Sequence, residues 1–104
     1  MEELSRTLNE EEIVERIAEA LQACGLDAGA QDTGGAIYCV VLPRQDGGEI
    51  IWGTADVNWG ATVTDDGGEI VSSISTTCPS DSQDVEAVAE VIKSHSIQAG
   101  TVTR

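Results

Sequence analysis

Aromatic and basic side chains are both scarce in this chain of 104 residues. Phenylalanine is absent and the only aromatic residues are Tyr38, Trp52 and Trp59, so the core has to rest on Ile, Val, Leu and Ala. Five lysines and arginines stand against 19 aspartates and glutamates, which gives a formal net charge of −14. Such a charge repels nucleic acid and anionic membranes and favours basic partners or cations. A second interpretation is that the charge only keeps the protein soluble.

Sequence features of export and membrane insertion are missing as well. No apolar run approaches the roughly 18 residues of a membrane-spanning helix. The chain opens with the acidic MEEL instead of a basic stretch followed by an apolar one, so we expect no signal peptide. The cysteines are odd in number and match no disulfide or metal spacing: Cys24, Cys39 and Cys78. The expected location is therefore the cytoplasm, with reduced thiols.

Residue patterns typical of enzymes and metal sites are also lacking. The one histidine, His95, falls near the end of a predicted helix, where the helix dipole stabilises a cation. Cys78 precedes that helix, some 20 Å away at about 1.5 Å per residue, so a Cys–His pair is not expected. Cys39 lies in a predicted strand and reads as a small core residue. With no C-x-x-C pair, calcium loop or phosphate-binding loop, the sequence predicts no catalysis, metal or cofactor.

Hydrophobic spacing predicts a single α+β domain over residues 1–104. Asn9 is the expected cap of a first helix over residues 10–24, with Glu12 completing a capping box and Gly25 ending the helix. Ser80 or Ser82 is the expected cap of a last helix. The remaining expected segments are a lead at 1–8, a polar connection at 27–35, strands at 36–42, 49–57 and 69–76, a continuation of the second strand at 60–64, the last helix at 82–95, and a weakly ordered tail at 97–104.

This order of elements favours an antiparallel meander of three to four strands with both helices on one face. Strand side chains alternate between the two faces, and the strand at 36–42 is apolar on both. The small side chains around Gly53 suit a packed helix, whereas Trp52 lies on the opposite face. We therefore expect Tyr38, Val40 and Trp52 to form an apolar interface covered by a second copy or a partner. The alternative is that residues 1–8 or the tail fold across it.

Carboxylates follow the predicted solvent face of the first helix. Glu11, Glu15 and Glu19 recur every four residues, about 6 Å apart along the axis, a separation similar to that of phosphates along a nucleic-acid strand. Further candidate residues of an acidic binding surface are Glu12 beside this row, Asp65 and Asp66 at a hairpin tip, and Glu86 and Glu90 on the last helix.

Two functions follow as hypotheses. The first is an inhibitor that mimics nucleic acid and blocks a basic nucleic-acid-binding protein. In length, charge and lack of a catalytic motif the chain resembles small acidic inhibitors of bacterial immunity, including anti-CRISPR and anti-restriction proteins, and no residue motif carries that resemblance. The second is a small accessory or structural homodimer whose acidity serves solubility. Affinity for a basic partner should fall steeply with salt, whereas association through apolar surface should persist.

Overall fold

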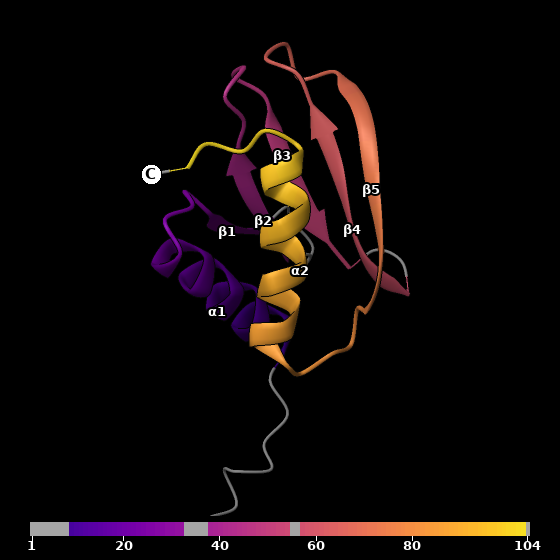
Figure 1. Ribbon diagram of the computed structural model, residues 1–104. Coiled ribbons are helices and arrows are strands. Elements are labelled where there is room, and N and C mark those ends of the chain that lie inside the picture. Colours follow the sequence, from indigo (N-terminus) through magenta and orange to yellow (C-terminus); the bar gives the residue numbers. More distant parts are fainter. Residues whose placement is uncertain (1–8, 33–37, 55–56, 104) are drawn as a thin grey trace, which may run out of the picture.

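The computed structural model describes residues 9–32, 38–54 and 57–103, and these form a sheet with two helices on one of its faces (Figure 1). The five strands are antiparallel and follow the order β1-β2-β3-β4-β5. The predicted α+β meander with both helices on one face is confirmed, with five strands instead of three to four. The elements are α1 (Glu10–Ala23), β1 (Gly29–Asp32), β2 (Tyr38–Pro43), β3 (Glu49–Gly53), β4 (Asn58–Thr64), β5 (Ile70–Pro79) and α2 (Val85–Gln98).

Helix α1 begins and ends as its sequence predicts. The Glu12 amide donates to Asn9 Oδ1 at 2.8 Å, and the Asn9 amide donates to Glu12 Oε1 at 3.2 Å, which completes the capping box. At the other end Gly25 has a φ of 89°, and the Leu26 amide donates to the Leu21 carbonyl at 3.0 Å. One face of α1 is buried, and this face fixes the helix on the sheet: Ile13, Val14, Ile17, Ala18 and Leu21.

The strands differ from the prediction in three places. Gly29–Asp32, expected within a polar connection, is β1, an outer strand whose only pairing is with β2 among the described residues. The predicted strand over 49–57 and its continuation at 60–64 are two antiparallel strands, because the chain reverses direction between Gly53 and Asn58. Cys78 and Pro79, expected in a loop, end β5, where an outer strand tolerates proline.

Helix α2 begins three residues later than predicted and ends three residues later. Its cap is Asp84, whose side chain accepts from the Ala87 amide at 3.2 Å. Neither predicted serine caps it. The Ser80 amide donates to the Val57 carbonyl at 2.9 Å, and Ser82 Oγ accepts from the Asp84 amide at 3.2 Å, so both serines hold the preceding loop. A charged acceptor at the helix N-terminus is also favoured by the dipole.

The segment predicted as a weak tail is attached to the sheet. Thr101 forms an isolated bridge with Arg44, and Thr103 forms one with Leu26. The Thr101 hydroxyl donates to the Pro43 carbonyl at 2.8 Å, and Thr101 is buried. Backbone pairing of this kind after α2 fixes the helix end against the β2–β3 turn.

The predicted apolar interface is wrong for two of its three residues. Val40 and Trp52 are cross-strand partners with no solvent exposure, and they face the helices. Trp52 Nε1 also donates to Ser96 Oγ on α2 at 2.9 Å. The larger side chains fill the space between sheet and helices, and the smaller side chains near Gly53 lie on the other face. A homodimer that forms through this face therefore loses its support. The alternative, in which residues 1–8 fold across the face, lies outside the described residues.

Candidate binding surfaces

The exposed side of α1 carries the carboxylates that the sequence places there. Glu11, Glu15 and Glu19 are exposed, on the side opposite the buried Ile13 and Ile17. Glu12, by contrast, is half-buried and engaged in the capping box. We call Glu11, Glu15 and Glu19 the α1 acidic row. Because the opposite face of α1 is buried, the helix backbone holds the three glutamates on the solvent side.

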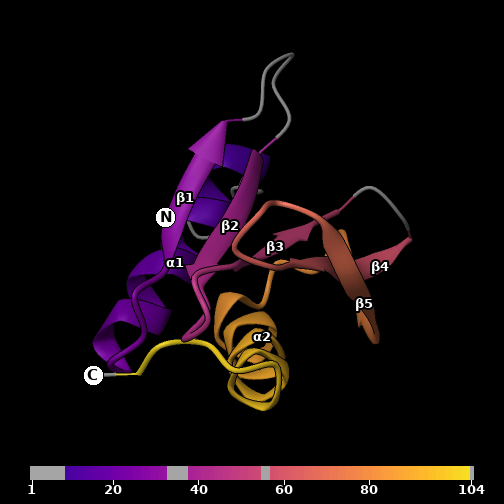
Figure 2. The same ribbon diagram turned by 90° about the horizontal axis from the view of Figure 1, so that it is seen from above.

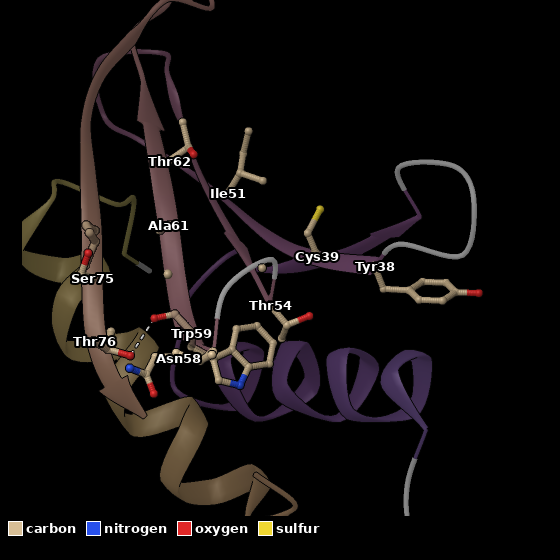
Figure 3. A pocket seen from close by; sticks show the side chains of 14 residues that line it. Tyr38, Cys39, Ile51, Thr54, Asn58, Trp59, Ala61, Thr62, Ser75 and Thr76 are labelled. Carbon is tan, nitrogen blue, oxygen red and sulfur yellow. Dashed lines mark hydrogen bonds between the residues drawn. The ribbon is translucent and has the colours of Figure 1, made fainter. Parts of the chain in front are cut away.

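Tyr38 lies beside the α1 acidic row at the start of β2. It is half-buried, and Figure 3 shows its ring extending away from the other labelled residues. The Tyr38 amide donates to Glu10 Oε2 at 3.4 Å, which brings β2 against the first turn of α1. The pKa of the phenol is raised, first by the carboxylate of Glu11, then by burial, and then by Asp32, Glu10 and Glu15. A partly exposed aromatic ring in the field of these carboxylates is suited to a guanidinium or ammonium group.

The other predicted acidic residues lie elsewhere. Asp65 and Asp66 occupy the β4–β5 turn, which Figure 1 places at a different end of the molecule from α1. Asp65 Oδ1 accepts from the Gly67 amide at 2.9 Å and the Glu69 amide at 3.0 Å, so this carboxylate shapes the turn. Acidic residues of this turn therefore do not extend the α1 acidic row.

On α2, Glu86 and Glu90 are both exposed, and Glu90 pairs with Lys93 at 3.7 Å. An exposed pair of this type contributes little to stability. The eight acidic residues predicted as one surface thus divide among α1, the β4–β5 turn and α2.

The sheet face turned away from the helices holds a shallow hollow of about 430 Å³ (Figure 3). Figure 3 shows Cys39, Ile51 and Thr62 pointing to the side opposite α1. The lining contains no carboxylate, lysine, arginine or histidine among the described residues. Burial, and secondarily Glu49, raises the pKa of the Cys39 thiol, so the thiol stays protonated at neutral pH.

Trp59 supplies a buried polar atom that the sequence did not reveal. Its indole Nε1 has no hydrogen-bond acceptor among the described residues, although Trp59 is buried. The ring borders a second hollow of about 450 Å³ between the start of α1 and the loop before α2. Since only the folded positions of these segments bring the indole there, no local sequence signal indicates this orphaned donor.

A groove of about 470 Å³ runs between β5 and α2. Thr76 and Cys78 line it from β5, and Ala87, Val91 and His95 line it from α2. The sequence predicted a loop at Cys78 and Pro79, so it did not indicate that β5 extends beside α2. A signal was available in the ten residues Ile70–Pro79, which carry no charge in an otherwise strongly acidic chain.

Cys78 and His95 line this groove without forming a pair. No hydrogen bond between them is found in the described part of the chain. Burial and then Asp84 raise the pKa of the Cys78 thiol, which places Cys78 near the first turn of α2. His95 lies about three turns further along the helix, with its ring 6.1 Å from that of Trp52. The groove therefore holds no activated thiolate.

Other kinds of site are not found in residues 9–32, 38–54 and 57–103. Three or more His, Cys, Asp or Glu side chains nowhere gather as a possible metal site there. None of the helices in those ranges has the length and apolar character needed to cross a membrane. Comparison of the chain with known protein families, with curated proteins and with solved structures finds no match.

Proposed function

We propose that this protein is a non-enzymatic acidic binding protein that docks onto a basic surface of another protein through α1. The observation that carries the proposal is the position of Tyr38 beside the α1 acidic row, where four carboxylates act on one partly exposed aromatic ring. Aromatic side chains are frequent anchors of interfaces, and a ring in a negative field attracts Arg or Lys.

The geometry of α1 favours a nucleic-acid-binding protein as the target. Glu11, Glu15 and Glu19 repeat at about 6 Å along a helix whose opposite face is buried, which resembles the repeat of a phosphate backbone. A groove that tracks phosphates with lysines and arginines would meet this row at similar intervals. The protein would then act as an inhibitor that occupies such a groove, in the manner of anti-CRISPR or anti-restriction proteins.

Affinity capture with matched charge variants tests this function. The immobilised protein is exposed to bacterial lysate at low and then high salt, alongside a Glu11→Gln, Glu15→Gln, Glu19→Gln variant. The control carries Glu69→Gln, Glu86→Gln and Glu90→Gln, which removes the same number of charges from other elements. Captured proteins are identified by mass spectrometry and challenged with DNA and RNA.

We expect a basic nucleic-acid-binding protein to be retained by the parent chain and the control, and lost by the α1 variant. High salt and added nucleic acid should both release it. Salt, nucleic acid and the α1 substitutions all weaken the same charged contacts. Capture of nothing basic, or equal loss from both variants, would contradict the proposal.

A further inference from the structure

Strand β5 is an open edge of the sheet. It is the last strand in the sheet order and pairs only with β4 among the described residues. In an antiparallel pair every second residue directs its backbone N–H and C=O towards the neighbour, and the others direct them outwards. Ser72–Ser75 pair residue by residue with β4, so in this part of β5 alternate residues leave outward backbone groups that another strand can pair with.

Strand β5 lacks most of the features that prevent an edge strand from pairing with another chain. Lysine and other charges are absent from Ile70–Pro79, and its one proline is the last residue. Ile70 and Val71 are 71% and 54% exposed, so the strand begins with two apolar side chains in solvent. The only evident protection is a pair of register shifts against β4. A long, uncharged and partly apolar edge is a template for strand addition.

Acidic residues stand beyond both ends of this uncharged strand. Asp65, Asp66 and Glu69 precede it in the β4–β5 turn, and Asp81 and Asp84 follow it before α2. The strand is about 34 Å long at about 3.4 Å per residue. An occupant that fits this charge pattern is uncharged in its centre and basic at its two ends.

The groove beside β5 provides room for side chains of an added strand. Alternate side chains of such a strand would point towards the helix side of the sheet, into the space bordered by Thr76, Ala87 and Val91. Apolar or β-branched side chains match this lining, whose only titratable groups are Cys78 and His95. The backbone pairing supplies affinity and the groove supplies selectivity.

We propose that an extended segment of a partner protein, uncharged and β-branched in its centre and basic at both ends, adds to the sheet as a sixth strand beside β5. This surface is separate from the α1 acidic row, since β1 and β5 are the opposite outer strands of the sheet (Figure 2). A second copy of the chain is the poorer occupant. Pairing of two β5 strands in either direction brings acidic ends against acidic ends, in addition to the repulsion between two molecules of charge −14.

A synthetic peptide provides the direct test. The probe is a fluorescent peptide of about ten residues, alternating Val and Thr, with two lysines at each end. One control peptide carries glutamates in place of the lysines. A second keeps the lysines but has all central amide nitrogens methylated, which removes the N–H donors for strand pairing and leaves the charge unchanged. Binding is followed by fluorescence anisotropy, and amide NMR shifts of the labelled protein locate the site.

A matched pair of helix variants tests the groove. Ala87→Arg places a long cation at an exposed groove position, and Ala23→Arg adds the same charge to an exposed alanine at the end of α1. Arginine is a good helix former, so both variants should fold, which circular dichroism checks.

We expect the lysine-ended peptide to bind and to shift amides of β5. Both control peptides should bind about tenfold or more weakly than the lysine-ended peptide. Ala87→Arg should weaken binding of the lysine-ended peptide about tenfold or more, and Ala23→Arg should change it about twofold or less. Equal binding of the methylated peptide, unaltered binding by Ala87→Arg, or shifts confined to α1 would overturn the proposal. A dimer in sedimentation that Ala87→Arg dissociates would also overturn it, because the occupant would then be a second copy.

Discussion

The two buried tryptophans differ in what their indole nitrogens meet. Trp52 Nε1 donates to Ser96 Oγ at 2.9 Å, whereas Trp59 Nε1 has no acceptor among the described residues. A buried donor without an acceptor costs about 1–3 kcal/mol. The hydrogen bond from Trp52 on β3 to Ser96 on α2 therefore avoids this cost at Trp52.

Replacing Ser96, which accepts the hydrogen bond from Trp52, should show how much this bond contributes to stability. We predict that Ser96→Ala lowers the free energy of unfolding by about 1–3 kcal/mol, because Trp52 Nε1 then stays buried without a partner. Ser94→Ala, at an exposed position of the same helix, should change it by about 0.5 kcal/mol or less. Urea denaturation of the two variants measures both values, and equal stability of the two would contradict the role assigned to Ser96.

Trp52 itself distinguishes a core residue from an interface residue. Trp52→Asp puts a carboxylate where the indole has no solvent exposure, so we predict loss of cooperative unfolding and of native near-UV circular dichroism. A folded, monomeric variant would instead restore the interface that the sequence predicted.

The phenol of Tyr38 reports the field of the α1 acidic row. Nearby negative charge disfavours the phenolate, so its pKa is raised, and Glu11 is the largest cause. Glu11→Gln should lower the phenol pKa more than Glu19→Gln, which is not among the causes. Tyr38 is the only tyrosine, so phenolate absorbance follows this group alone. A pKa that is equal in the two variants would show that the row does not act on this ring.

At the scale of the elements, local signals were predicted well and pairing was not. The cap at Asn9 and the end at Gly25 involve neighbours within five residues, and the sequence located both. Strand β1 is polar and has no alternating pattern, so only its pairing with β2 defines it. Asp84 was missed as a cap because Ser80, with Gln83 three residues later, has the spacing of a capping box, and the contact of Ser80 with Val57 is long-range.

The capping box of α1 has a measurable energy. Asn9→Ala removes the oxygen that accepts from the Glu12 amide, so we predict a loss of about 1 kcal/mol in the free energy of unfolding. Asn9→Ser keeps an acceptor and should lose much less. Chemical denaturation measures the difference, and an equal loss in both variants would contradict the cap.

At the scale of the whole molecule, the sequence predicted the fold class and the exposed α1 acidic row but chose the wrong face for Trp52. Alternation in a strand says which side chains share a face, and it does not say which face the helices cover. That choice depends on how the volumes of Val40, Trp52 and the α2 side chains fill one layer. The groove between β5 and α2 was not predicted because the expected strand ended at residue 76, before Cys78, which lines the groove.

The net charge of −14 serves binding only if carboxylates at particular positions contact the partner. The salt dependence of the affinity tests this. For a captured basic partner, the logarithm of the affinity should fall steeply with the logarithm of salt concentration. The slope should be much smaller for the Glu11→Gln, Glu15→Gln, Glu19→Gln variant than for the parent chain or the control with Glu69, Glu86 and Glu90 replaced. An affinity that is indifferent to salt, or an equal slope in all three proteins, would contradict recognition through α1.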